Sequence, residues 1–518
     1  MPSAAYIAIG VFLLTYLLAA ALSARYYTYM LQLVSYHPKD FIRWGKTNLV
    51  GSLILKVFPA IISFVLLFFA NTAVFYIASA LNVIYFIGFL PKKAKKPFKY
   101  TSRVIRLLIT QALISALAVL VCVLTGSFCL LAFELVIMFL VVFFANIINK
   151  PVEKAVKNHY INEAKAIIDA RKDNLTVIGI TGSYGKTSTK YYLEKILSQK
   201  YNVLMTPGSY NTTMGVVRVI REMLKPSHEI FICEMGARNI GDIKEICDIV
   251  HPKHAIITSV GPQHLETFKS IENVSDTKFE LADAVSDGFV VLNGDNEYIT
   301  SRKCEKNCVY YGIDNKNADF TAENIELSSK GTSFAVKYDG GEAQISTRLI
   351  GSHTVLNILA CFAMAKKLDV PDSDIAIAVR KLEYVPHRLQ LIDAGECVMI
   401  DDAFNSNPSG AKAALDALSS FDGVKILVTP GMVELGEKQF ELNKTFGAQA
   451  SAVCDYIFIV GKYNLDSISA GAKEAGFDVD GRLASSSKLE DAVSEARALE
   501  SGKRKYILLE NDLPDNFR

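Results

Sequence analysis

The first 150 residues are dominated by uninterrupted apolar runs. Tyr6 to Leu22 nearly matches the ~20 residues that cross a bilayer core, and no basic segment precedes it, so we expect a span and not a cleaved signal. The stretch from Leu49 to Leu90 carries one charge, Lys56, and is long enough for two spans that turn near Asn71. Two further apolar runs follow, at 107–124 and 129–144. The pattern predicts an N-terminal α-helical membrane domain of about five spans.

Basic residues gather on one side of the predicted spans. With five spans, three segments fall on the same side and are rich in lysine and arginine, whereas the two opposite turns have neither. These residues are Arg25, Lys39, Arg43, Lys46, Lys92, Lys93, Lys95, Lys96, Lys99, Arg103, Lys150, Lys154 and Lys157. Since cytoplasmic loops carry such an excess, we expect a multi-pass protein of the cell membrane with its N-terminus outside and its large C-terminal part cytoplasmic. Buried core helices are the alternative, and the charge pattern disfavours them.

Beyond the apolar region, short apolar runs alternate with helical patterns. From Thr176 to about Lys381 this alternation is interrupted by a β-rich stretch at 309–349, which predicts an α/β, P-loop parallel-sheet ATPase domain. From Leu389 the alternation resumes and predicts a smaller Rossmann-like domain, with a cleft between the two. The expected domains are 1–150 (membrane), 151–388 (central, ATP-binding) and 389–518 (C-terminal).

The first strand of the central domain runs into a glycine loop. Thr181-Gly-Ser-Tyr-Gly-Lys-Thr-Ser-Thr stands between an apolar run and residues at helical spacing. Such a loop points backbone N–H groups at phosphate oxygens; Lys186 can meet the terminal phosphates of ATP, and the Thr187 hydroxyl can ligate Mg²⁺. The strict motif has glycine where this chain has Ile180, so a chance turn before a helix is the alternative. The expected nucleotide contacts here are Gly182, Ser183, Tyr184, Gly185, Lys186, Thr187 and Ser188.

Two later strands are followed by groups that can bind a metal ion. The run 230–233 ends at Glu234, and the run 255–258 is followed by His264. Ligands bind at the carboxyl ends of parallel strands in open α/β sheets, so Thr187, Glu234 and His264 could share divalent ions with phosphates. Magnesium prefers oxygen ligands, and a lone histidine is more often structural, so the His264 contact needs support.

Net charge and cysteine content bear on the class of partner and on the redox compartment. The formal net charge of +2, from 55 Lys and Arg against 53 Asp and Glu, indicates no nucleic-acid partner. Nine cysteines form no regular framework, which indicates a reducing compartment. Cys304 and Cys308 form a lone CxxxC pair, for which we expect unpaired thiols in preference to a zinc site.

The motifs between about Thr176 and Glu437 resemble those of the Mur ligase family. The resemblance is greatest to the branch that adds D-alanyl-D-alanine to UDP-N-acetylmuramoyl-tripeptide. Besides the glycine loop, the matching segments are Asn211-Thr-Thr-Met-Gly, Glu234-Met-Gly-Ala, Gly261-Pro-Gln-His-Leu-Glu, Asp276-Thr-Lys-Phe-Glu, Gly351-Ser-His-Thr-Val-Leu-Asn, Pro386-His-Arg, Asp401-Asp-Ala-Phe-Asn-Ser-Asn-Pro and Gly431-Met-Val-Glu-Leu-Gly-Glu. Their order along the chain is more specific than any one of them.

The resemblance implies roles for single residues. The catalytic residues would be Lys186, Glu234, His264 and Lys278. The ligands of Mg²⁺ would be Thr187, Glu234, His264 and Lys278. Lys278 would be carbamylated, which lets it reach a second Mg²⁺. Asn357, Arg388 and Asp402 would bind the nucleotide, and Asn211, Thr212, Thr213, Asn405 and Asn407 the substrates. Without the resemblance, Lys278 would be a solvated helix lysine, and Asn211 and Asn357 turn or helix-face residues.

The implied reaction is formation of an amide bond in peptidoglycan precursor synthesis. A carboxylate of a muropeptide or similar substrate attacks the γ-phosphoryl group of ATP, and an amino acid or dipeptide displaces phosphate from the acyl phosphate. Two departures matter: the predicted spans replace the domain that grips the uridine nucleotide, and the C-terminal region lacks a KGSR-like signature. A Mur-like ligase acting on a lipid-linked carboxylate is therefore an alternative. A P-loop ATPase coupled to a transporter or sensor is a weaker one, since the spans hold only Lys56 and Glu134 as charges.

Overall fold

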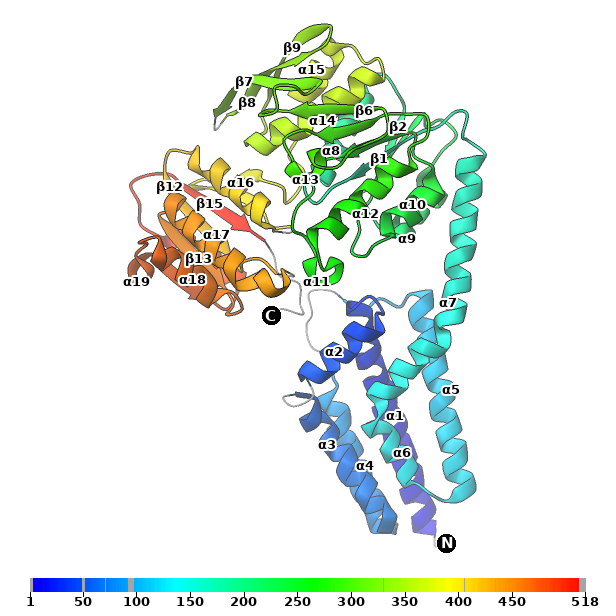
Figure 1. Ribbon diagram of the computed structural model, residues 1–518. Helices are drawn as coiled ribbons and strands as arrows, with labels where there is room; N and C mark the ends of the chain where they lie inside the picture. Colours follow the sequence, from blue (N-terminus) through cyan, green and yellow to red (C-terminus); the bar gives the residue numbers. More distant parts are fainter. Residues whose placement is uncertain are drawn as a thin grey trace. The chain divides into compact units, whose positions relative to one another are not determined.

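The N-terminal part of the computed structural model is entirely helical. The structure describes residues 3–48, 52–69, 71–91, 97–328, 330–404, 406–433 and 435–511, which form two compact units, Met1–His159 and Tyr160–Arg518. The helices that begin in the first unit are α1 (Ser3–Leu33), α2 (Pro38–Asn48), α3 (Ile54–Leu66), η2 (Leu67–Phe69), α4 (Thr72–Gly88), α5 (Ser102–Thr125), α6 (Cys129–Val136) and α7 (Met138–Asp169) (Figure 1). Large apolar side chains lie both inside this unit, as Phe12 and Tyr85 do, and on its outside, as Leu14 and Leu113 do. Helices that are apolar all round are typical of a lipid environment.

Fewer helices meet the length of a membrane span than the sequence predicts. Among the described residues, α1 and α5 are long and apolar enough to cross a bilayer, and α6 with α7, bent by 75°, adds a third if the pair is one span. The remaining apolar helices are shorter: α3 contains Pro59 and passes into the 3₁₀ turn η2, and α4 has 17 residues. Asn71 caps α4, which places the chain reversal where the sequence predicts it. The count of five spans is thus not confirmed.

The acidic residue within the predicted spans is hydrogen-bonded inside the helical unit. The Tyr16 hydroxyl donates to one oxygen of Glu134, and the Ser115 hydroxyl donates to the other, both at 2.6 Å. A buried carboxylate needs such donors because it has left water. These two contacts account for Glu134 as part of the helix packing.

The second unit begins with a nine-stranded sheet in the order β2-β3-β1-β4-β5-β6-β7-β8-β9. Strands β1 to β7 pair in parallel, and β7, β8 and β9 pair antiparallel, so the parallel-sheet prediction and the β-rich interruption are both confirmed. The strands are β1 (Thr176–Thr181), β2 (Val203–Met205), β3 (Ile230–Glu234), β4 (His254–Ile257), β5 (Val290–Asn293), β6 (Cys308–Gly312), β7 (Phe320–Ser328), β8 (Gly331–Tyr338) and β9 (Gly341–Thr347).

Helices cover both faces of this sheet. Ile178 and Ile180 of β1 pack against the α8 and α14 face, whereas Val177 packs against α9, α10 and α12 (Figure 1). A strand buried on both faces reads as a continuous apolar run, as β1 does. The helices are α8 (Lys186–Leu197), α9 (Thr213–Met223), α10 (Asp242–Val250), α11 (Leu265–Phe268), α12 (Ile271–Ala284), α13 (Glu297–Thr300), α14 (Ser352–Lys367) and α15 (Asp372–Arg380).

A six-stranded sheet completes the unit, in the order β10-β11-β15-β12-β13-β14. Its strands are β10 (Gln390–Asp393), β11 (Cys397–Asp402), β12 (Val424–Thr429), β13 (Tyr456–Val460), β14 (Leu483–Ser486) and β15 (Lys505–Glu510). Its helices are α16 (Pro408–Ser419), η3 (Gly436–Lys438), α17 (Gln439–Val453), α18 (Leu465–Glu474), α19 (Val479–Arg482) and α20 (Leu489–Ala498). The last strand, β15, inserts between β11 and β12, so the end of the chain reaches the middle of the sheet.

One expectation about cysteine is wrong. Cys304 and Cys308 are joined as a disulfide, whereas their sequence pattern predicts unpaired thiols. The loop before β6 brings the two Cα atoms to 6.9 Å, and sequence spacing alone does not report such a turn. The other seven cysteines are free.

Candidate nucleotide and metal site

The loop after β1 has the strand–loop–helix form that the sequence predicts. Gly182 and Gly185 both have positive φ (151° and 80°), and α8 begins at Lys186. A Cβ on Gly185 would lie 2.6 Å from the Asn357 side-chain oxygen, so only glycine fits there. Lys186 Nζ donates to the backbone oxygens of the loop itself, at 2.5 Å from Gly182 and 3.3 Å from Ser183. Burial lowers the pKa of Lys186 to about 8, and nearby Glu234 opposes that shift.

Glu234 lies at the carboxyl end of β3 and joins several predicted site residues. Its Oε1 is 3.2 Å from the Thr187 hydroxyl and accepts a hydrogen bond from Asn211 Nδ2 at 3.1 Å. Its Oε2 lies 2.9 Å from Lys190 Nζ. Burial alone would raise the pKa of Glu234, but the charges of Lys190 and Lys186 overcome it, and the pKa lies below its usual value. The carboxylate is therefore held ionised beside the glycine loop.

Lys190 is a site residue that is not predicted from the sequence. Its side chain is inaccessible, and its Nζ also donates to the Gly208 backbone oxygen at 2.5 Å. The signal was available, because Lys190 follows Lys186 by four residues and so shares its helix face. A lysine on the face that looks at a buried carboxylate becomes its counter-ion.

Lys278 and His264 occupy different settings. Lys278 is buried on α12; burial, together with the charge of Lys186, lowers its pKa to about 7. His264 precedes α11 with a positive φ of 51° and is partly exposed. The described part of the chain holds no cluster of three or more His, Cys, Asp or Glu side chains arranged for a metal ion. The roles of Lys278 and His264 as ligands remain predictions.

The predicted substrate and adenine residues have structural contacts of their own. Thr212 caps α9 by accepting from Gly215 N, and the Thr213 hydroxyl donates to Glu245 at 2.5 Å. Asn211 holds Glu234 and also accepts from Gly236 N through its backbone oxygen. Asn357 is buried beside the loop, where its side-chain oxygen accepts from Thr189 at 3.3 Å.

Acidic side chains meet at the carboxyl edge of the six-stranded sheet. Asp402 of β11 and Glu510 of β15 are register partners. Burial raises the pKa of Asp402 to about 6 although Arg388 lowers it; burial and Asp402 raise the pKa of Glu510 well above its usual value. Arg388 lies 4.3 Å above the Phe404 ring, and its charge is felt by both carboxyl groups. Arg388 and Asp402 are predicted from the sequence. Glu510 is not, although it ends an apolar strand just as Glu234 does.

One further predicted residue of this edge, Asn407, has a structural role. Asn407 caps α16 by accepting from Gly410 N at 2.7 Å. Asn405 lies outside the described residues. The Tyr184 hydroxyl of the glycine loop donates to the Pro262 backbone oxygen at 3.0 Å, and Ser409 at the start of α16 lies close enough to influence the pKa of Tyr184.

Comparison with known proteins identifies the family. The Mur ligase middle domain matches residues 180–365, and the Mur ligase glutamate ligase domain matches residues 387–510. UDP-N-acetylmuramoyl-tripeptide–D-alanyl-D-alanine ligase of Escherichia coli K12 is 31% identical over 296 residues, 55% of this chain and 64% of that protein. The Bacillus subtilis enzyme of the same name is 31% identical over 293 residues, 55% of this chain and 63% of that protein. The chain thus spans just under two thirds of the length of these relatives.

Solved structures share the fold. A crystal structure of MurF from Acinetobacter baumannii is similar with a TM-score of 0.61 and 25% identity, covering 69% of this chain and 78% of that one. MurF ligase from Thermotoga maritima, solved in complex with ADP, has a TM-score of 0.61 and 24% identity, covering 69% and 80%. Taken with the domain matches and the geometry of the glycine loop, these similarities place the chain in the Mur ligase family.

Proposed function

We propose that this chain is an ATP-dependent ligase that forms an amide bond on a peptidoglycan precursor, of the D-alanyl-D-alanine-adding type. The observation that carries the proposal is Glu234, held ionised between Thr187 and Lys190 at the mouth of the glycine loop. Such a carboxylate beside a phosphate-binding loop suits phosphoryl transfer, in which positioning and charge stabilisation supply most of the catalysis.

The residues of the glycine loop would bind ATP. The backbone N–H groups at the start of α8 would cradle the phosphates, and Lys186 would exchange its backbone partners for phosphate oxygens. Arg388 would add positive charge from the C-terminal sheet, since its charge already influences Lys186. Asn357 and Asp402 would contact the rest of the nucleotide. Closure of the two sheets on each other would shield an acyl phosphate from water.

Magnesium fits part of the predicted ligand set. Thr187 and Glu234 offer two oxygen atoms 3.2 Å apart, and the low pKa of Glu234 keeps its carboxylate charged. A bound Mg²⁺ would neutralise charge on the transferring phosphoryl group. His264 and Lys278 would complete the set. The lowered pKa of Lys278 makes its neutral amine available for condensation with carbon dioxide, which is what carbamylation requires.

The N-terminal helices would place this chemistry at the membrane. We propose five spans, an outer N-terminus and cytoplasmic catalytic domains, with boundaries at residues 150 and 388; the long apolar helices α1 and α5 support insertion. These helices occupy the sequence position where a domain that binds the uridine nucleotide is expected. A lipid-linked carboxylate is therefore the second candidate substrate. The substrate residues would be Asn211, Thr212, Thr213, Asn405 and Asn407.

Phosphate release by the purified full chain tests the proposal. ATP and Mg²⁺ are mixed with D-alanyl-D-alanine and either UDP-linked or lipid-linked muramoyl-tripeptide, with each component omitted in turn. We expect release only when nucleotide, carboxylate and amine are all present, and its loss in Lys186→Ala. The two carboxylate substrates are compared by their kcat/KM, and the one with the higher value is the preferred substrate. Release without an amine would instead favour the ATPase of a transporter or sensor.

A further inference from the structure

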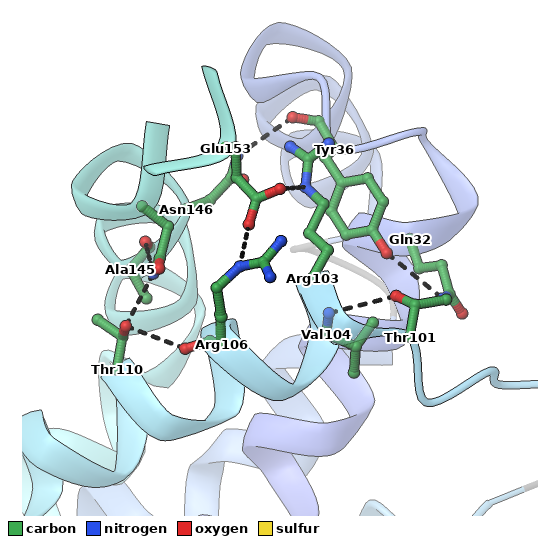
Figure 2. Close-up of polar contacts among 11 residues, drawn as sticks. Gln32, Tyr36, Thr101, Arg103, Val104, Arg106, Thr110, Ala145, Asn146 and Glu153 are labelled. Carbon is green, nitrogen blue, oxygen red and sulfur yellow. Dashed lines mark hydrogen bonds and ion pairs between the residues drawn. The ribbon is translucent and has the colours of Figure 1, made fainter. Parts of the chain in front are cut away.

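Three charged side chains form a cluster near the start of α5. Glu153 of α7 accepts a hydrogen bond from Arg106 Nε at 2.7 Å, and its other oxygen lies 3.8 Å from Arg103 Nε (Figure 2). Arg103 and Arg106 are three residues apart, so they share one face of α5. Both arginines converge on the same carboxylate.

The aromatic ring of Tyr36 stacks against the guanidinium group of Arg103. The Arg103 guanidinium carbon lies 3.9 Å from the centre of the Tyr36 ring (Figure 2). The Tyr36 backbone has a positive φ of 64°, and its oxygen accepts from Asn146 Nδ2 at 3.1 Å. Gln32 donates to the Tyr36 hydroxyl at 3.4 Å and bonds both backbone groups of Lys99. Tyr36 is thus held by two hydrogen bonds, one at its backbone oxygen and one at its hydroxyl, and its ring positions the Arg103 guanidinium group.

Both arginines of this cluster share the carboxylate of Glu153. Two guanidinium groups face one carboxylate, and the N-terminus of α5, which begins at Ser102, adds further positive potential. Arg103 Nε is buried and has no hydrogen-bond partner among the described residues. Leaving a buried donor without a partner is unfavourable, and Arg103, in the first turn of α5, opposes the helix dipole. An anion with several acceptor oxygens could bind at the exposed part of the two guanidinium groups, whose side chains are 35% and 29% exposed, and would offset the positive charge.

We propose that the Arg103–Arg106 cluster binds the phosphate group of an anionic lipid at the membrane surface. Guanidinium groups bind phosphate oxygens in a planar fork, and Arg103 stacked on Tyr36 keeps its edge pre-organised for that contact. The position fits, because α5 continues from this cluster and, among the described helices, is one of two long and apolar enough to cross a bilayer. Lipid headgroups lie at the ends of such helices. The inference rests on the proposed membrane insertion but not on the ligase reaction.

Two lipids could supply this phosphate. One is a bulk phospholipid such as phosphatidylglycerol, and the other is the pyrophosphate of a polyprenyl-linked carboxylate substrate. In the second case the cluster would hold the lipid end of the substrate.

The test is lipid-induced thermal stabilisation of the full chain in detergent. Phosphatidylglycerol, polyprenyl pyrophosphate and phosphatidylcholine are titrated against wild type, Arg103→Gln/Arg106→Gln, and a control with the same charge change, Lys150→Gln/Lys154→Gln. Both control lysines are exposed on α7 near Glu153. We expect the arginine pair variant to need at least tenfold more anionic lipid, ~1.4 kcal/mol of binding, while the lysine control and all phosphatidylcholine titrations stay unchanged.

Several outcomes are decisive. Equal stabilisation of wild type and the arginine variant, or an equal loss in the lysine control, would overturn the proposal, since diffuse charge would then explain binding. If the double variant fails to fold, Arg103→Lys keeps the charge but not the fork and should still weaken binding. A preference for polyprenyl pyrophosphate over phosphatidylglycerol assigns the site to the substrate, and equal binding assigns it to the bilayer. Because the readout needs no ATP turnover, failure of the ligase assay leaves it intact.

Discussion

Lys190 Nζ lies 2.9 Å from Glu234 Oε2, and both side chains are withdrawn from solvent. Breaking a buried pair leaves a charge without compensation and typically costs 3–5 kcal/mol. We therefore expect Lys190→Met to lower thermal stability strongly and to raise the pKa of Glu234, so that ligase activity falls more at neutral pH than at high pH. Circular dichroism melts and a pH–rate profile measure the two effects.

Lys195→Met is the matched control for this prediction. Lys195 is on the same helix but is exposed, so its loss should leave stability and the pH profile unchanged within about 0.5 kcal/mol. A Lys190→Met variant as stable and active as the control would show that the pair does not hold Glu234.

The central site was predictable where local pattern decides structure. Strand β1, the glycine loop and α8 follow from an apolar run, two glycines and helical spacing, and they form as expected. Lys190 and Glu510 were not found because their importance comes from what faces them: Lys190 meets Glu234 from another strand, and Glu510 meets Asp402 because β15 inserts between β11 and β12. Apolar runs predicted the helices of the first unit, but Pro59 and the break at η2 keep α3 short of a full span.

Lys278→Ala should inactivate the enzyme, and short carboxylic acids such as acetate should partly restore activity. A small anion can occupy the place of a carbamate, whose formation the lowered pKa of Lys278 favours. Initial rates with and without acetate measure the effect, and an exposed lysine variant such as Lys244→Ala gives the background. Full activity of Lys278→Ala would end the carbamate hypothesis.

Glu510→Gln should stabilise the protein increasingly as pH rises. In the folded wild type the pKa of Glu510 is raised well above 4.5, so the stability that its proton supplies is complete below 4.5 and is lost as pH rises through the folded pKa. Glutamine resembles the protonated acid and escapes that loss. The difference in unfolding free energy should grow by up to about 1.4 kcal/mol per pH unit above pH 4.5, until the pH passes the folded pKa of Glu510.

The exposed residue Glu500 supplies the comparison. Glu500→Gln should show no such pH-dependent gain, because its carboxylate is solvated in the folded state. A flat difference for Glu510→Gln as well would mean that the folded protein does not retain the Glu510 proton.

A reporter fused after Arg518 should be cytoplasmic, and one placed before Tyr6 should lie outside the cell. Replacing Lys92, Lys93, Lys95 and Lys96, which lie outside the described residues, should weaken this orientation because positive charge near span ends sets it. Protease added to intact cells reads the result independently. Digestion of the C-terminal part from outside would contradict both the orientation and access to cytosolic ATP.

Transfer of oxygen from the carboxylate to phosphate tests the central claim most directly. A muramoyl-tripeptide whose reacting carboxylate carries oxygen-18 is incubated with the full chain, ATP, Mg²⁺ and D-alanyl-D-alanine. The mass of the released phosphate is then measured by mass spectrometry. An amide ligase working through an acyl phosphate must deliver one labelled oxygen to each phosphate, and Lys186→Ala should release none. Phosphate that forms at the same rate but carries no label would show that water attacks ATP, and the ligase account would be wrong.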